Sequence, residues 1–447
     1  MADNLRIYLA TFNCGRELLD VNYFAANLFN GYEGELPPDL IVLSLQEIAP
    51  LGYSFLGGSF LNSYFMRFNQ AIIDGTGLKF GKNAGYSQVI ARNAGMTGIV
   101  IFAKHGVEER VRSMQTGAVG VGFWSMGNKG AVGVRLRMDL AGYGSEESVL
   151  SFVAAHLAPA EDQCERRNQD WKSICEGLVF EGTSSAKRVT GESEAEPLLS
   201  EESDGKEDGS LFRPASYLFF AGDLNYRTSD TAPEPGSQKD WPQPVESRSD
   251  PHHWSQHLPK DQLIREMKRN NTLHLLDEAP INFGPTYKFS SAASKQALHA
   301  VESQTRELAD GRQVAVTSYK AGANEDVWLW AQHRTPSWCD RILFLAASKP
   351  TVHSYAALPV QPTSDHRPVA LSLSIPAKPF KVDGVEPPFD VKPGWKERRA
   401  TARRYELMVG LVAFLGYTWE GEALLAGTLI GLIGGYFALS ALIVSSS

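Results

Sequence analysis

Short apolar runs recur through the first 375 residues of this chain, and most of them carry a polar residue at one end. In the run at 217–221, aromatic and aliphatic residues stop abruptly at Gly222-Asp223-Leu224-Asn225. A short apolar run bounded in this way predicts a buried strand. Asp and Asn are poor strand formers, so this strand end indicates either a turn or a functional site.

Further segments share this pattern and complete a set of expected strands. They cover residues 5–13, 39–47, 98–103, 130–136, 148–155, 340–345 and 369–375. Their polar ends include Asn13, Glu47, His156 and Asp340. Core packing gives no reason for polar residues at so many strand ends, whereas ligands and catalytic groups collect at sheet edges. We therefore expect these residues to share one active-site edge.

The segments between the strands divide into helices and loops. Helices are expected at 21–30, 59–75, 161–180 and 260–269. Residues 181–210 are rich in Ser, Gly and acidic residues, and 229–253 are rich in Pro, Asp and Ser, which predicts mobile loops; 292–324 stays open. We expect residues 1–376 to form one domain.

The C-terminal region has a different composition. Residues 377–405 are first Pro-containing and then basic, which indicates a linker, and 406–447 are hydrophobic. Residues 423–444 carry no charge and are long enough to span a membrane. Because basic residues mark the cytoplasmic side of a span, we expect a tail anchor with the folded domain in the cytosol. Residues 407–419 are marginal in length, so an interfacial helix and half of a hairpin both remain open.

Composition restricts the class of partner and of chemistry. The net charge of -8 argues against a nucleic-acid partner. The four cysteines include no C-x-x-C pair, which indicates reduced thiols in the cytosol. None has an arginine six positions later, as a cysteine-dependent phosphatase would need, and neither a GxxxxGK[ST] loop nor an HExxH zinc motif is present.

The first strand ends suit metal-assisted work on a phosphate group. A hard cation such as Mg²⁺ takes oxygen ligands, which Asn13 and Glu47 offer from neighbouring early strands. Asp223 is a candidate to orient or deprotonate an attacking water. Asn225 is a candidate to donate a hydrogen bond to the same phosphate.

Histidines supply the second part of the expected site. Asp365 and His366 precede the last strand, and a carboxylate can hold an imidazole in one tautomer; Asp340 is a candidate for that role. His156 is a second imidazole for leaving-group or phosphate work. A lone histidine at a strand end is more often structural. The catalytic interpretation of His156 and His366 therefore rests on the whole set of polar strand ends.

Six sequence blocks resemble those of the inositol polyphosphate 5-phosphatases, over roughly residues 5 to 375. In chain order they are Leu-Gln-Glu at 45–47, Gly-Asn-Lys-Gly at 127–130, Gly-Asp-Leu-Asn-Tyr-Arg at 222–227, Pro-Thr-Tyr-Lys-Phe at 285–289, Pro-Ser-Trp-Cys-Asp-Arg-Ile-Leu at 336–343 and Ser-Asp-His-Arg-Pro-Val at 364–369. With its hydrophobic tail, the chain is most similar to the fungal tail-anchored members.

The resemblance implies an α+β fold of the DNase I-like superfamily, a four-layer α/β/β/α sandwich with two sheets face to face. The C-terminal membrane helix would be added to it. Residues implied for the Mg²⁺ site are Asn13, Glu47 and Asp365, and those implied for catalysis are Asp223, Asn225, His156, His366 and Asp340. Residues implied for substrate binding are Asn128, Lys129, Tyr287, Lys288, Arg334 and Arg341. One departure is Gln332, where members often carry a basic residue.

The function implied is Mg²⁺-dependent removal of the 5-phosphate from phosphatidylinositol 4,5-bisphosphate, at the cytosolic face of the endoplasmic reticulum membrane. The partners would be a phosphoinositide headgroup and the membrane itself, bound through the tail and its basic flank. Two alternatives remain: an endonuclease or sphingomyelinase of the same superfamily, and a catalytically dead phosphoinositide-binding scaffold. The oligomeric state stays open.

Overall fold

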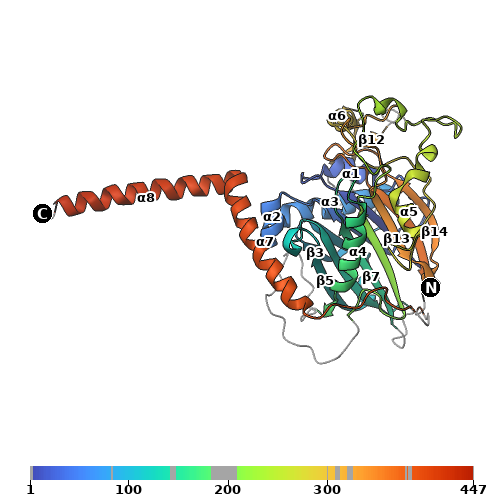
Figure 1. Cartoon of the computed structure of the whole chain (residues 1–447), viewed down its shortest axis with the longest axis horizontal. Coiled ribbons are helices and arrows are strands. Elements are labelled where there is room, and N and C mark those ends of the chain that lie inside the picture. Colours follow the sequence, from blue (N-terminus) through green and yellow to red (C-terminus); the bar gives the residue numbers. More distant parts are fainter. Residues whose placement is uncertain are drawn as a thin grey trace.

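Two β-sheets packed face to face form the centre of the molecule (Figure 1). This computed structural model describes residues 4–81, 84–140, 147–182, 209–299, 301–307, 313–319, 326–377, 380 and 385–445. In spatial order the first sheet consists of β14 (Thr351–Ala357), β15 (Val369–Pro376), β1 (Asn4–Asn13), β2 (Leu40–Gln46), β4 (Thr97–Lys104) and β3 (Tyr86–Ala94). The second consists of β10 (Leu276–Glu278), β13 (Asp340–Leu345), β9 (Ser216–Asp223), β7 (Ser148–His156), β6 (Gly130–Met138), β5 (Val111–Gly120) and β8 (Glu181–Gly182).

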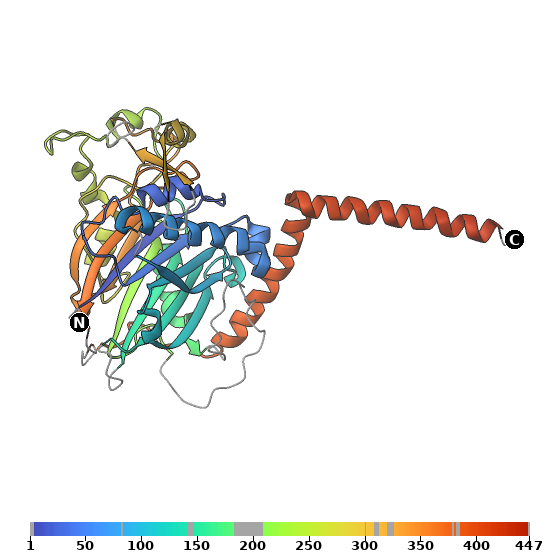
Figure 2. The same ribbon diagram turned by 180° about the vertical axis from the view of Figure 1, so that it is seen from behind.

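Helices cover the outer faces of both sheets (Figures 1 and 2). In chain order the helices of the described residues are α1 (Val21–Asn27), α2 (Leu51–Leu56), α3 (Asn62–Phe80), α4 (Cys164–Gly177), α5 (Gln262–Lys268), α6 (Ser291–His299), α7 (Trp395–Tyr417) and α8 (Trp419–Ser445). Of these, α8 covers neither sheet. A separate antiparallel pair is formed by β11 (Val301–Glu307) and β12 (Gln313–Tyr319). The expected arrangement of two sheets between helices is confirmed.

Strand β9 shows why the apolar runs form a core on both of their faces. Successive side chains of a strand point to opposite faces. Phe219 packs against Phe152 between the two sheets, with ring centroids 5.2 Å apart, whereas Phe220 packs against Trp171 of α4 at the same centroid distance. A strand buried on both faces has no polar position along its length, which explains the continuous apolar pattern.

The strand pairing brings the polar ends together. β1 and β2 are parallel, and so are β7 and β9, so in each pair the carboxyl ends lie at one edge, with Asn13 opposite Gln46 and His156 opposite Asp223. β13 is antiparallel to β9, and its first residue, Asp340, lies opposite the last residue of β9, Asp223. The polar residues that end these parallel strands and the one that begins β13 therefore lie at the same edge.

The eight expected strands correspond to β1, β2, β4, β6, β7, β9, β13 and β15, and the four expected helices overlap α1, α3, α4 and α5. The partly exposed strands β3, β5 and β14 and the short helix α2 were not expected. Most of the predicted loop at 181–210 lies outside the described residues. The 229–253 loop contains one short 3-10 turn, Ser237–Asp240.

The C-terminal segment differs from the expected linker. Helix α7 begins at Trp395, inside the 377–405 segment, and residues 395–405 are therefore helical. Its buried positions Ala402, Glu406, Gly410 and Ala413 recur at helical spacing and form a narrow stripe against the domain. The linker interpretation was wrong for this part because the stripe contains small residues and one acid rather than large apolar residues. The 407–419 run is the second half of α7 and the start of α8.

Helix α8 leaves the domain as an isolated rod (Figure 1). Its segment Trp419–Ile443, 25 residues long, is apolar enough to cross a membrane and is not buried by the rest of the chain. Thr418 between α7 and α8 is extended, with φ -121° and ψ 145°, and its side-chain oxygen accepts from the Gly421 amide at 3.1 Å. Tyr53 of α2 donates to the Glu420 carboxylate at 2.8 Å, so the joint is held against the domain.

Candidate active site

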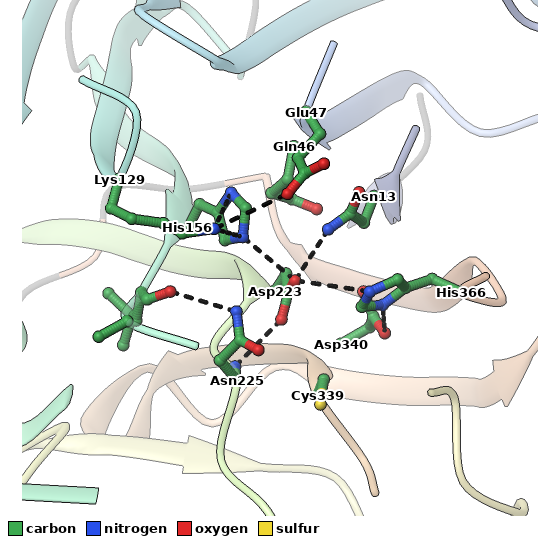
Figure 3. Close-up of polar contacts among 12 residues, drawn as sticks. Asn13, Gln46, Glu47, Lys129, His156, Asp223, Asn225, Cys339, Asp340 and His366 are labelled. Atoms are coloured by element: carbon green, nitrogen blue, oxygen red, sulfur yellow. Dashed lines mark hydrogen bonds and ion pairs between the residues drawn. The ribbon is translucent and has the colours of Figure 1, made fainter. Parts of the chain in front are cut away.

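The carboxylate of Asp223 lies at the centre of the polar strand ends (Figure 3). Its Oδ2 accepts a hydrogen bond from Asn13 Nδ2 at 2.9 Å, and His156 Nε2 lies 3.3 Å from the same oxygen. His366 Nε2 lies 3.8 Å from it. Burial raises the pKa of Asp223, but His366, His156 and Lys129 outweigh burial and hold it well below its usual range. Asp223 is therefore an ionised hydrogen-bond acceptor whose own carboxylate is buried.

Asn225 follows on a sharp turn of the chain. Its φ is 57°, a left-handed conformation that Asn tolerates better than most residues. The backbone amide of Asn225 donates to Asp223 Oδ1 at 3.1 Å, and its side-chain Nδ2 donates to the Leu157 carbonyl at 3.2 Å. Arg227 Nη2 donates to its Oδ1 at 2.6 Å. These contacts fix the side chain and leave one Nδ2 proton for a ligand.

His366 and Asp340 form the expected pair. His366 Nδ1 lies 2.9 Å from Asp340 Oδ2, and Thr286 donates to that oxygen at 2.7 Å. Burial lowers the pKa of His366, but Asp340 and Asp223 outweigh it and raise the pKa to about 9. Burial raises the pKa of Asp340 to about 6. At neutral pH the imidazole is therefore cationic and directs Nε2–H toward the central carboxylate.

His156 forms the opposite wall with Lys129. Lys129 Nζ lies 2.6 Å from His156 Nε2, and burial lowers the pKa of both groups. The imidazole is thus neutral, and its Nε2 faces both Lys129 Nζ and the Asp223 carboxylate. The Lys129 side chain is 16% exposed, so it remains within reach of a ligand that enters the site.

Glu47 and Asn13 suit a hard cation. Glu47 has a φ of 46°, and its side chain, 22% exposed, is 3.0 Å from Arg16 Nε and 3.8 Å from Lys129 Nζ. A carboxylate that remains partly open beside an amide oxygen donor is the ligand chemistry that Mg²⁺ prefers. The third expected ligand, Asp365, forms an ion pair with Lys288, and its Oδ1 lies 3.9 Å from His366 Nε2.

Asp223, Asp340 and His366 form a second group of possible metal ligands. Their ligand atoms lie within 4.8 Å of one another. Because His366 Nδ1 is already hydrogen-bonded to Asp340, we interpret this group as a means of holding a proton. The Glu47 side is the better metal site by donor chemistry.

The expected substrate residues occupy different positions. The Tyr287 ring packs on His366 with centroids 4.5 Å apart, and Lys288 follows it at the edge of the site. Asn128 precedes Lys129, and its Oδ1 is buried with no hydrogen-bond partner among the described residues. Arg334 lies 3.3 Å from Glu161 and is 35% exposed.

Arg341 was wrongly assigned to substrate binding. Its side chain is fully buried and pairs with Asp261 at 3.0 Å and with Glu278. Neighbouring residues of a strand point to opposite faces of the sheet, so Arg341 points away from the face on which Asp340 binds His366. It is a structural cation inside the domain.

Two residues near the site were missed. Arg227 is 1% exposed and lies over the Tyr287 ring, 4.3 Å from its centroid, besides binding Asn225. Thr286 is buried against Asp340. Both lie inside the six sequence blocks, so the signal was present, but neither residue had been assigned a role.

Known proteins share both the sequence and this fold. The model of Endonuclease/Exonuclease/phosphatase family 2 matches residues 10–372. The chain is 27% identical over 410 residues to type II inositol polyphosphate 5-phosphatase 15 of Arabidopsis thaliana, covering 83% of this chain and 32% of that protein. It is 29% identical over 276 residues to phosphatidylinositol 3,4,5-trisphosphate 5-phosphatase 1 of Rattus norvegicus, covering 61% and 18%. The chain thus spans a third or less of these relatives.

A solved structure has the same fold at a TM-score of 0.56 and 20% identity, covering 91% of this chain and 90% of that one. It is the inositol polyphosphate 5-phosphatase domain of SPsynaptojanin in complex with inositol (1,4)-bisphosphate and calcium ion. The resemblance drawn from the six blocks is confirmed. The chain belongs to the endonuclease/exonuclease/phosphatase family 2, and the relatives named here are inositol polyphosphate 5-phosphatases.

Proposed function

We propose that this protein hydrolyses the 5-phosphate of phosphatidylinositol 4,5-bisphosphate with Mg²⁺ as cofactor. The observation that supports this most is the ionised Asp223 held between Asn13, His156 and the cationic His366. The names of the relatives supply the substrate class, an inositol phosphate or phosphoinositide. The specific lipid and the specific metal go beyond these relatives and belong to the proposal.

In the proposed reaction a water oxygen attacks the phosphorus atom and the bond to the inositol oxygen breaks. A proton lost by the water is balanced by the proton that the leaving inositol oxygen takes up. Asp223 accepts a hydrogen bond from the attacking water and orients it. His366 Nε2–H donates to a phosphoryl oxygen, where negative charge grows. Mg²⁺, held by Glu47, Asn13 and Asp365, would supply charge neutralisation at the phosphate.

The other basic residues would bind the rest of the headgroup. Lys129 and Lys288 flank the site from opposite walls, and their charges offset the acidic total of the domain. Tyr287, Asn128 and Arg334 complete the proposed surface for the ring phosphates, notably the 4-phosphate.

A substrate panel on the purified full chain in detergent tests this function. We expect phosphate release from phosphatidylinositol 4,5-bisphosphate with Mg²⁺, leaving the 4-phosphate lipid. Phosphatidylinositol 3,4,5-trisphosphate and a soluble inositol trisphosphate in the same panel define the range. Cleavage of DNA or sphingomyelin instead would establish one of the alternative enzymes, and binding without turnover would establish the scaffold.

The C-terminal helix supports a second part of the proposal, anchoring in the endoplasmic reticulum membrane with the catalytic domain in the cytosol. Helix α8 has the length and composition of a span, and basic residues of 392–404 precede it. Deleting 419–447 removes α8 and keeps α7 in place. We expect this variant to move to the soluble fraction of cells; if it stays with membranes, α8 is not the main anchor.

A further inference from the structure

Helix α7 reaches the active-site wall through one buried carboxylate. Glu406, 7% exposed, accepts a hydrogen bond from the backbone amide of Gly127 at 2.7 Å. Its other oxygen accepts from Arg403 at 3.1 Å, and Arg403 donates in turn to the Phe55 and Leu56 carbonyls at the end of α2. A buried carboxylate is costly unless hydrogen bonds and charge compensate it, and here one of those bonds goes to a loop 279 residues away in the chain.

That loop carries Lys129. Gly127 precedes Lys129 by two residues, and the Lys129 carbonyl accepts from the Val121 amide at 2.8 Å, which closes the hairpin between β5 and β6. The Gly127 carbonyl accepts from the Met96 amide at 2.9 Å, and the Met96 carbonyl accepts from the Ile48 amide at 3.2 Å. A chain of backbone hydrogen bonds thus runs from Glu406 to the peptide next to Glu47.

The surroundings make this contact hard to replace. A cavity of about 280 Å³ lies beside it, lined by residues of α7, β3 and β5 that include Gly120 and Glu406, and by Ser125 of the turn between β5 and β6. Tyr405 stacks on Trp124 of the same loop with centroids 5.2 Å apart, but both rings are exposed. Among the described residues, Glu406 is the only one whose side chain accepts a hydrogen bond from the Gly127 amide.

We propose that α7 is part of the catalytic unit and that Glu406 is a positioning residue, which holds Gly127 and thereby places Lys129 for the substrate. This inference rests on the proposed function. It predicts that a chain cut before α7 retains its sheets but works poorly as an enzyme.

Kinetics of the full chain in detergent test the proposal, with a soluble inositol trisphosphate so that membrane attachment plays no part. We expect Glu406→Ala to lower kcat/KM about ten-fold, as loss of a hydrogen bond to a charged group would. Glu406→Gln keeps an acceptor oxygen and should recover part of this loss. Glu420→Ala is the matched control, because its carboxylate also ties the C-terminal helices to α2 but touches no part of the Lys129 loop.

A double variant separates positioning from general damage. If Glu406 acts through Lys129, adding Glu406→Ala to Lys129→Met should change kcat/KM by less than about two-fold, whereas independent effects would multiply. An additional ten-fold loss in the double variant overturns the proposal. The proposal is also overturned if Glu406→Ala alone has the same kcat/KM as Glu420→Ala. Should Glu406→Ala fail to fold, the same comparisons are made with Glu406→Leu, which fills more of the space but has no acceptor oxygen.

Hydrogen exchange provides a readout that needs no substrate. Amides 127–129 should exchange faster in Glu406→Ala, or in Glu406→Leu, than in Glu420→Ala. Equal exchange overturns the proposal. If the wild-type chain releases no phosphate from any inositol phosphate, the proposed function fails, and exchange alone then decides the role of Glu406.

Discussion

Replacing Asp223 by asparagine will lower kcat by about 10³-fold, within the range known for loss of a positioned acid–base group or charge-stabilising donor. The side chain keeps its shape, but its charge is lost. Asn13 and His156 then face an amide in place of a full acceptor, and His366 loses a carboxylate that helps to keep it cationic. Rate measurements at saturating substrate and Mg²⁺ check the prediction.

The same change at an exposed position is the control. Asp250 accepts a hydrogen bond from His252 on the surface loop, and Asp250→Asn should leave kcat unchanged. Near-ultraviolet circular dichroism should show that both variants are folded. A folded Asp223→Asn protein that retains a tenth or more of the wild-type kcat would contradict the central role of this carboxylate.

Removal of divalent metal will abolish phosphate release, and added Mg²⁺ will restore it. Glu47→Gln should then raise the Mg²⁺ concentration needed for half-maximal activity by about 100-fold or more, since even the outer partners of metal ligands contribute about 10- to 100-fold in affinity. The change removes a negative charge from the open side of the site while Arg16 and Lys129 remain. Titration of activity with Mg²⁺ measures the effect.

Glu109→Gln is the control for this series, because Glu109 is exposed in the turn just before β5. It should respond to Mg²⁺ as the wild-type protein does. Activity that survives chelation would refute the metal requirement. An unaltered Mg²⁺ dependence in Glu47→Gln would show that another group holds the ion.

The central strands were predictable because burial on both faces leaves a continuous apolar pattern. β9 and β2 are of this kind, and their ends mark the site. β5 has few fully buried positions, and its mixed sequence carries no clear period. Local pattern therefore finds the strands that hold the site and misses the partly exposed ones around them.

The site itself shows two limits of sequence reasoning. Arg341 lies next to Asp340 on a strand, so the two side chains point to opposite faces of the sheet, which membership of the same sequence block does not reveal. Glu406 could not be found at all, because its partner Gly127 is distant in the chain and contributes only a backbone amide. Every residue except proline has a backbone amide, so the identity of Gly127 gives no sign that a distant carboxylate binds it.

The short joint at Thr418 has a consequence for how substrate is met. With α8 in a membrane, one extended residue and the Tyr53–Glu420 contact separate the span from the catalytic domain, instead of a long tether. The enzyme would then work only on the leaflet in which it is anchored and would not reach across to an opposing membrane. Encounter would be two-dimensional, and turnover would depend on the surface density of the lipid and its lateral diffusion rather than on a bulk concentration.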